Sequence, residues 1–261
     1  MAGGTITALY QYPVKSMAGF SCTTALALPS GFEWDRRWML IDENHKMITQ
    51  REIPKLCQFF PTIEEGQLSI SFEGEHCSLP LHETIGPHFI SQVWDDDTSV
   101  VRTSDAIDHW LSDRLGQKVS LVKVIERFHY AAPIDATVEV SGADGYPFLV
   151  LGTASLEHLS TAAGEPIDIR RFRPNIVITT TTAHEEDDWS AINTGEVKLQ
   201  KVKPCLRCQI IDIDQDSGER KGVVTKTLST YRRMGNNIGF GASYVGLSTG
   251  ELSVGDKFQC I

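Results

Sequence analysis

The sequence predicts a mainly β fold of the α+β class, with two β-barrel-like units and a few short helices. Short runs of β-branched and aromatic residues recur along the chain, turn residues separate these runs, and only two segments have clear helical periodicity. Such a rhythm of short strands and turns favours barrels or sandwiches over a parallel sheet with alternating helices.

The predicted strands begin close to the N-terminus. Residues 5–12 are β-branched and aromatic and end before Pro13, as an edge strand does. Residues 37–42 read as a buried strand that follows a turn at Ser30-Gly31 and is closed by Glu43-Asn44. Further short strands are predicted at residues 67–72, 88–93 and 119–124.

Two segments predict helices. Ser104 is placed to cap a helix over residues 106–115, whose apolar side chains share one face and which stops at Gly116. A second helix ends at Gly164, with Thr153 or Ser155 as its cap. Between residues 126 and 142 the pattern lapses, which predicts a connection between an N-terminal unit, residues 1–125, and a C-terminal unit, residues 126–261.

Bulk composition narrows the class of protein. A chain of 261 residues with 41% hydrophobic residues can bury one large core or two modest ones. The first residues lack the layout of a signal peptide, and no apolar run approaches the ~20 residues of a membrane span. The six cysteines are too scattered for a secreted disulfide scaffold. We therefore expect a cytoplasmic protein with reduced thiols and no membrane association.

The charge distribution indicates the kind of ligand. A net charge of −10 argues against a general nucleic-acid binder, because such binding depends on basic residues that neutralise phosphates. Basic residues nevertheless recur in compact runs, such as those at residues 36–37, 170–173 and 201–207. The runs predict either a pocket for one small anion or an ordinary solvated surface.

The motif Cys205-Leu206-Arg207-Cys208 has several possible meanings. A structural zinc site needs four ligands, and a second cysteine pair at similar spacing is missing. A thioredoxin-like pair should open a helix, whereas this motif runs into an alternating β-branched segment. A thiolate favoured by the neighbouring Lys203 and Arg207 could bind a soft metal or carry a persulfide. Two structural cysteines remain the plain alternative.

Two basic segments could bind an anion. If residues 170–178 are extended, Arg171, Arg173 and Asn175 project to one face and Phe172 to the other. That face would offer forked donors to phosphate oxygens, or it would form surface ion pairs with the acidic run at residues 185–188.

The second basic segment lies near the N-terminus. Lys15 and Arg36 at strand or loop ends could meet over one anion, with a hydrogen bond from Ser16. A nucleotide-binding glycine loop is missing, so nucleotide binding is disfavoured.

Taken together, these segments resemble the MOSC superfamily, in particular the subgroup with an N-terminal MOSC β-barrel that includes mitochondrial amidoxime-reducing components. The resemblance spans nearly the whole chain and keeps the family's order. Its segments are YPVKS at 12–16, DRRWMLID at 35–42, QREIPKL at 50–56, DGYPFLVLGTASLEHL at 144–159, RFRPNIVI at 171–178, EDDW at 186–189, CLRCQIIDIDQDSGE at 205–219 and VGD at 254–256.

The resemblance implies a site for the molybdenum cofactor, a pterin dithiolene that holds the metal. The family's metal-ligating cysteine aligns with Cys208, which makes Cys208 both metal ligand and catalytic residue. The anchors of the phosphate and pterin fall on Lys15, Ser16, Arg36, Arg173, Asn175 and Arg207, and further candidates on Tyr146 and on Ser243 or Tyr244. The resemblance also implies that the site lies in a cleft between the two units.

The implied activity is a molybdenum-dependent reduction of N-hydroxylated small molecules. The plant-type ferredoxin cysteines of some relatives are missing, so we expect electrons from a separate ferredoxin- or cytochrome-like protein. The aminotransferase-like domain of sulfurases is also missing, so pyridoxal phosphate is not expected. Asp212, Asp214 and Tyr244 are candidate proton donors if they line the cavity. The alternatives are sulfur transfer through a Cys208 persulfide and a non-catalytic carrier of the cofactor.

Overall fold

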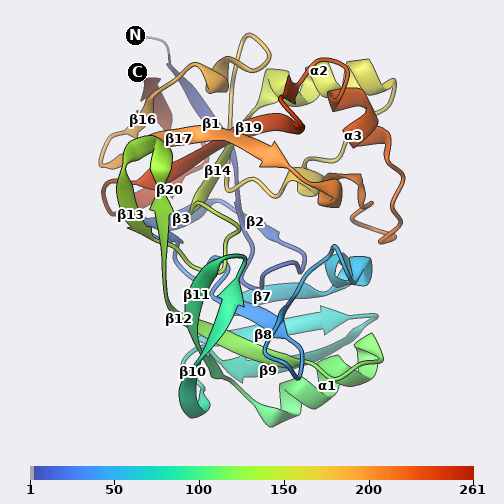
Figure 1. Ribbon diagram of the computed structural model, residues 1–261. Coiled ribbons are helices and arrows are strands. Elements are labelled where there is room, and N and C mark those ends of the chain that lie inside the picture. Colours follow the sequence, from blue (N-terminus) through green and yellow to red (C-terminus); the bar gives the residue numbers. More distant parts are fainter. Residues whose placement is uncertain (1–2) are drawn as a thin grey trace.

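The computed structural model describes residues 3–261 and consists of two β-rich halves, one above the other in Figure 1. Strands make up most of the regular structure, and three α-helices lie among the described residues. The prediction of a mainly β fold with a few short helices is confirmed.

A closed barrel of seven strands forms the upper half in Figure 1. Around the barrel the strands are β14 (Phe148–Gly152), β15 (Ile176–Ile178), β1 (Gly3–Gln11), β21 (Lys257–Cys260), β16 (Ala191–Thr194), β17 (Val197–Arg207) and β19 (Asn237–Gly246). β19 pairs back with β14, which closes the ring and leaves no free edge between the two strands.

Short strands extend this half. β2 (Phe20–Cys22) pairs with β1, and β18 (Arg233–Met234) pairs with β19. A separate sheet is formed by β20 (Gly250–Ser253), β3 (Thr24–Leu28) and β4 (Gly31–Phe32).

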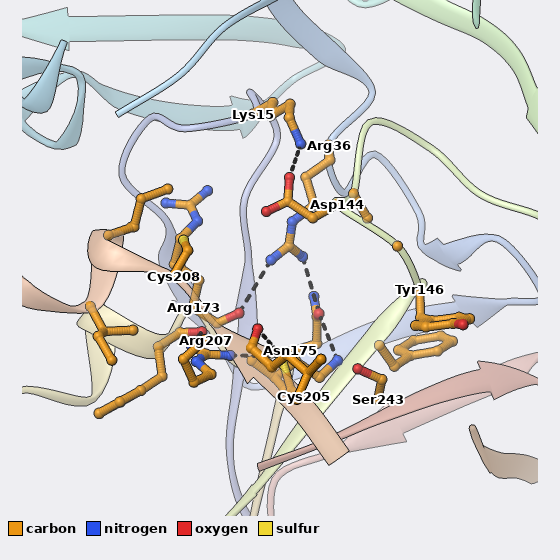
Figure 2. A pocket seen from close by; sticks show the side chains of 18 of the residues that line it. Lys15, Arg36, Asp144, Tyr146, Arg173, Asn175, Cys205, Arg207, Cys208 and Ser243 are labelled. Atoms are coloured by element: carbon orange, nitrogen blue, oxygen red, sulfur yellow. Dashed lines mark hydrogen bonds and ion pairs between the residues drawn. The ribbon is translucent and has the colours of Figure 1, made fainter. Parts of the chain in front are cut away.

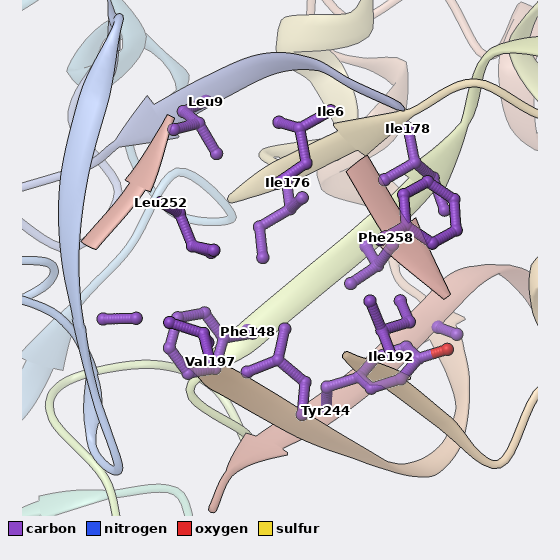
Figure 3. Packing of buried hydrophobic residues seen from close by; sticks show 14 of the residues in the cluster. Ile6, Leu9, Phe148, Ile176, Ile178, Ile192, Val197, Tyr244, Leu252 and Phe258 are labelled. Carbon is purple, nitrogen blue, oxygen red and sulfur yellow. The ribbon is translucent and has the colours of Figure 1, made fainter. Parts of the chain in front are cut away.

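Apolar side chains fill the interior of the barrel (Figure 3). Ile6, Leu9, Ile176 and Phe258 are among the buried residues that pack there, and each such side chain contributes about 1.5–3 kcal/mol by leaving water. The rings of Phe32 and Phe148 meet edge to face, with centroids 5.3 Å apart. Because the interior is packed, a ligand site must lie outside the barrel.

The lower half contains a curled five-stranded sheet. Its order is β10 (Ile85–Val93), β11 (Asp96–Arg102), β12 (Ser120–Ala131), β5 (Trp38–Ile41) and β6 (Met47–Ile48). A bridge between Lys46 and Gln92 brings the two outer strands together, so the sheet approaches a small barrel. A meander of β7 (Phe60–Glu64), β8 (Gln67–Phe72) and β9 (Glu75–Pro80) and the helix α1 (Asp105–Leu115) complete this half.

The chain passes between the halves more than once. β1 and β3 come from the beginning of the chain but pair with strands from its end. β12 is longer than predicted, and β13 (Ala136–Glu139) pairs with its second part. The prediction of a connection without strand pattern at residues 126–142 was therefore wrong, because most of these residues form the hairpin of β12 and β13. The boundary at residues 125/126 falls inside β12, and the division into two units stays a prediction.

Helices occupy the periphery. α1 begins after Ser104, whose side chain makes no capping hydrogen bond, and it ends at Gly116 in the left-handed conformation. α2 (Thr153–Ala163) follows Gly152 and ends at Gly164. Elements that were not predicted are α3 (Val223–Leu228) and the 3-10 turns η1 (Pro54–Gln58), η2 (Ala132–Ile134), η3 (Ile169–Phe172), η4 (Glu185–Asp187) and η5 (Gln209–Asp212). None of the helices within residues 3–261 has the length and apolar content to cross a bilayer.

Candidate functional site

A cavity of about 400 Å³ has walls from both halves of the molecule. Residues 15–16, 36, 50 and 94 come from the first part of the chain, and the other lining residues follow residue 128. Lys15, Ser16, Arg36, Tyr146, Arg173, Asn175, Arg207 and Cys208 all line it. The cavity thus brings together every residue that was predicted as a metal ligand or cofactor anchor except Tyr244.

The walls are strongly basic, although the chain is acidic overall. Among the lining residues only Asp144 is acidic, whereas the basic ones are Lys15, Arg36, Arg171, Arg173, Lys203 and Arg207. A concave, basic surface on a chain with net charge −10 concentrates anions against the field of the rest of the protein. The arrangement therefore favours a small anionic ligand.

Lys15 is held at one end of the cavity (Figure 2). Its Nζ donates to Gly142 O at 2.7 Å and forms an ion pair with Asp144. Burial lowers the pKa of Lys15 to about 8, against the opposing effect of the Asp144 carboxylate. Enclosure alone would raise the pKa of Asp144, but the cations Lys15 and Arg51 hold it well below its usual range. Ser16 follows in the left-handed conformation, with φ of 67°.

Arg36 is fixed by a buried polar network. Its guanidinium pairs with Asp35 and donates to Asn175 Oδ1 at 3.0 Å and to Arg173 O at 3.2 Å. Asn175 also donates from Nδ2 to Asp35 Oδ2 at 3.1 Å and accepts from Leu149 N at 3.3 Å. Asn175 is almost fully buried, and its side-chain amide makes hydrogen bonds to other residues of the protein. Asn175 therefore holds Arg36 in place.

Arg36 and Arg173 share one aromatic support. Their guanidinium carbons lie 4.5 Å and 4.3 Å from the centroid of the Tyr12 ring, which is within cation–π range. Both arginines have left-handed backbones, with φ of 50° and 55°. Non-glycine residues rarely adopt this conformation, and such strain is concentrated at functional sites.

The structure corrects the expected extended conformation of residues 170–175. Residues 169–172 form the turn η3, because Asp168 Oδ1 accepts from Arg170 N at 2.8 Å and caps it. Arg171 therefore pairs with Asp214, and Arg170 with Asp168 and Asp216, rather than with residues 185–188. Arg171, Arg173, Asn175 and Phe172 all line the cavity, so the predicted division into two faces was wrong.

Each thiol of the Cys205–Cys208 motif contacts a guanidinium. Arg207 Nη1 lies 2.9 Å from Cys205 Sγ, and Arg51 Nη2 lies 3.2 Å from Cys208 Sγ. Cys208 is half-buried at the start of η5, directly after β17 ends at Arg207. A guanidinium beside sulfur stabilises negative charge on it, as metal ligation or nucleophilic chemistry requires.

Several buried donors around the cavity lack a partner within the described chain. They are Arg173 Nη2, Arg207 Nε, Arg171 Nε and Arg51 Nη1. An unpaired buried donor is costly, and oxygen atoms of an anionic ligand would satisfy such groups. The donor set, with a thiol and several guanidinium groups, fits a ligand that carries phosphate oxygens and a soft metal.

Tyr146 and Ser243 lie on the opposite side of the view from Cys208 (Figure 2). Burial raises the pKa of Tyr146, whose ring meets His129 edge to face with centroids 5.4 Å apart. Tyr244, the next residue along β19, faces the other way because side chains alternate along a strand. It lies in the barrel core, so its expected place in the cavity was wrong.

The residues expected to donate protons if they lined the cavity do not form part of its wall. Asp212 accepts from Thr225 N at 2.9 Å, and Asp214 pairs with Arg171. Neither carboxylate nor Tyr244 lines the cavity, so the condition on which they were candidates is not met.

The sequence assigned no site role to Gln50, Arg51, Trp94 or Asp144. Gln50, Trp94 and Asp144 line the cavity, and Arg51 contacts Cys208. Gln50, Arg51 and Asp144 lie in segments that carried the family resemblance, which was the available signal. Trp94 had no comparable signal.

Comparison with known proteins identifies the family. The model of the MOSC N-terminal beta barrel domain matches residues 3–118, and that of the MOSC domain matches residues 137–259. Mitochondrial amidoxime reducing component 2 of Bos taurus is 31% identical over an alignment of 283 positions, gaps included, which covers 97% of this chain and 82% of that protein. Mitochondrial amidoxime-reducing component 1 of Mus musculus is 30% identical, over 88% of this chain and 72% of that protein.

Longer proteins match as well. Molybdenum cofactor sulfurase of Drosophila yakuba is 29% identical over 95% of this chain but only 33% of the sulfurase, so the chain spans about a third of such relatives. The crystal structure of the YUAD protein from Bacillus subtilis has the same fold over 98% of this chain and 94% of its own, with a TM-score of 0.50 and 8% identity. The chain, with its closed barrel and its thiol-bearing basic cavity, therefore belongs to the MOSC family.

Proposed function

We propose that the protein binds the molybdenum cofactor in this cavity and reduces N-hydroxylated small molecules, with electrons from a separate ferredoxin- or cytochrome-like protein. The observation that carries the proposal is the position of the Cys208 thiol on a basic cavity whose buried guanidinium groups have unpaired donors. Similarity to proteins named amidoxime-reducing components supports the reaction class.

The residues divide into three tasks. Lys15, Ser16, Arg36, Arg173 and Arg207 would hold the phosphate and pterin, with Tyr146 on the far wall. Cys208 would provide the thiolate ligand of the metal. Asn175 would act indirectly, because its amide already holds Arg36 and Asp35. When bound, the cofactor supplies two-electron oxygen-atom transfer.

The overall reaction balances as a two-electron reduction. An N-hydroxylated compound takes up two electrons and two protons, its N–O bond breaks, and an amine or amidine and water leave. The electrons come from the external protein. The cavity residues bind and orient the reactants, and the basic walls lower the energy of negative charge that develops on oxygen.

Sulfur transfer is the second candidate, because proteins named molybdenum cofactor sulfurase match nearly the whole chain. In that case the Cys208 thiolate would take the outer sulfur atom of a donor persulfide, with release of the donor thiol, and would pass that sulfur to an acceptor, which returns Cys208 to the thiolate. The Arg51 guanidinium beside Cys208 Sγ would serve this chemistry as well.

A reduction assay distinguishes these functions. The loaded protein is incubated without oxygen with benzamidoxime or hydroxylamine and reduced methyl viologen as electron donor, and the amidine or ammonia is measured. We expect turnover that Cys208→Ser abolishes and Cys77→Ser, a change in the distant strand β9, leaves intact. No turnover by metal-loaded protein would reject the reductase. A mass increase of one sulfur atom on the Cys208 peptide would then support sulfur transfer, and its absence would leave a carrier.

A further inference from the structure

Arg51 connects the two halves of the molecule at the thiol. Its Nη2 is 3.2 Å from Cys208 Sγ and 3.3 Å from Asp144 Oδ2, although 157 residues separate Arg51 from Cys208. We propose that Arg51 is a positioning residue for Cys208, which fixes the direction of Sγ at the cavity. The inference rests on the proposed function only in taking Cys208 as the thiol that binds the metal or carries sulfur.

The guanidinium of Arg51 is itself held in place. It lies over the ring of Trp94, with 4.4 Å between its central carbon and the ring centroid, and its side chain is 18% exposed. Trp94 Nε1 donates to Asp144 Oδ1 at 3.2 Å, so the carboxylate that accepts from Arg51 also orients the ring beneath it. Stacking and the ion pair together leave the guanidinium little rotational freedom.

Trp94 is placed by backbone geometry more than by burial. It has a left-handed backbone with φ of 58°, and 45% of the residue is exposed. A bulky residue in this conformation is unusual, and exposed aromatic residues gain little from burial. The position is explained by the support that the ring gives to Arg51.

A second contact fixes the backbone of Arg51 to the segment that carries the thiol. Arg220 Nη2 donates to Arg51 O at 3.2 Å, while its Nη1 donates to Gln209 Oε1 at 3.1 Å. Gln209 directly follows Cys208 in the chain. Arg220 therefore restrains the backbone of Arg51 and the residue next to Cys208 in one arrangement.

The contact at Cys205 has a different origin. Arg207 is only two residues from Cys205, so that pair is local, whereas Arg51 reaches Cys208 from the other half of the molecule. Burial raises the pKa of Cys22 and Cys57 to about 11 and also raises the pKa of Cys77 and Cys260, which makes these four thiols slow to react near neutral pH. Alkylation can therefore be followed at the two cavity thiols.

The test uses metal-free full-length protein and iodoacetamide at one neutral pH, with the modified Cys208 peptide quantified by mass spectrometry over time. We expect Arg51→Ala to slow alkylation of Cys208 several-fold, since Sγ loses the contact that holds it at the cavity and can turn away from the reagent. Arg51→Lys should retain part of the rate, and millimolar guanidinium added to Arg51→Ala should restore part of it. The matched control is Arg114→Ala, which removes another stacked and ion-paired arginine, 4.2 Å over Trp110 and far from the thiol, and should leave the rate unchanged.

Trp94→Ala provides an independent variant, because an exposed side chain can be removed at little cost in stability. It should slow Cys208 alkylation several-fold while Cys205 keeps its rate. A Cys208 rate within twofold of wild type in folded Arg51→Ala and in Trp94→Ala would overturn the inference. Because no turnover is measured, failure of the reductase proposal would leave this result unaffected.

Discussion

Nη1 of Arg36 donates a hydrogen bond to Oδ1 of Asn175 at 3.0 Å, across 139 residues of sequence. Through this bond an amide at the start of β15 determines where a cation from the beginning of the chain lies in the cavity. The same amide binds Asp35, whose Oδ1 accepts from Tyr12 N at 2.7 Å. The anion-binding wall therefore depends on buried groups that need not touch a ligand.

Replacing Asn175 by alanine should lower the free energy of unfolding by about 2–4 kcal/mol. The change removes one donor from the buried Asp35 carboxylate, takes the side-chain acceptor from Leu149 N and removes the restraint on Arg36. Urea denaturation measures the loss, and Asn44→Ala in an exposed turn serves as control. A loss below about 0.5 kcal/mol would contradict the assigned role of Asn175.

Anion binding should weaken at alkaline pH through Lys15. Its pKa of about 8 means that the ammonium group loses its proton above that pH, and with it the attraction for an anion. Titration calorimetry with inorganic pyrophosphate from pH 6.5 to 9.5 should show affinity falling above about pH 8. Lys15→Arg keeps its charge and should not show this fall, whereas an equal fall in both proteins would exclude Lys15 as its source.

The same lysine has an opposite effect on the stability of the ligand-free protein. Its pKa is lower in the folded chain than the ordinary 10.5, so between about pH 8 and 10.5 the unfolded chain binds more protons. The contribution of Lys15 to stability therefore increases as pH rises through this window. Urea denaturation of wild type and Lys15→Met should show that the difference between their unfolding free energies shifts in favour of wild type from pH 7.5 to 10. A shift in the other direction would contradict the burial of this ammonium group.

Arg127 should be essential for the loop that carries Asp144. Its side chain is fully buried, and its guanidinium donates to Asp96, to Ser141 O and Ala143 O, and to Asp144 O at 3.3 Å. Arg127→Met should cost about 2–4 kcal/mol, because the half-buried Asp96 carboxylate loses its arginine partner and three carbonyls lose a donor. Denaturation and hydrogen exchange of residues 141–147 check this, with the exposed Arg233→Met as control. Unchanged exchange in this loop would refute the assignment.

The sequence predicted the strands and helices best where local pattern and burial agree. Residues 67–72 form β8 as predicted, and the helix expected over residues 106–115 is α1 with its stop at Gly116. β12 was cut short because Arg127 reads as a surface charge, although the structure buries it against backbone carbonyls. The closure of the barrel by β14 and β19 depends on pairing across about a hundred residues, which no local pattern contains.

The residues of the candidate site were predicted where they stand in segments that resemble the family. Cys208, Lys15 and Arg36 stand in segments with a family resemblance, and the structure places them on one cavity. Tyr244 was misplaced because adjacent residues of a strand face opposite sides, and Ser243 takes the cavity side. Arg51 gains its role through its contacts with Asp144 and Cys208, which single residues in a sequence do not reveal.

The most direct test of the central claim is the molybdenum and pterin content of protein purified from a host that makes the cofactor. Wild type, Cys208→Ser, Cys205→Ser and the distant control Cys77→Ser are compared, together with a molybdoenzyme from the same host. The account predicts near-stoichiometric molybdenum in wild type and Cys77→Ser and its loss in Cys208→Ser. Absence of molybdenum from wild type while the reference enzyme is fully loaded, or full retention in Cys208→Ser, would contradict Cys208 as the ligand of a resident molybdenum cofactor.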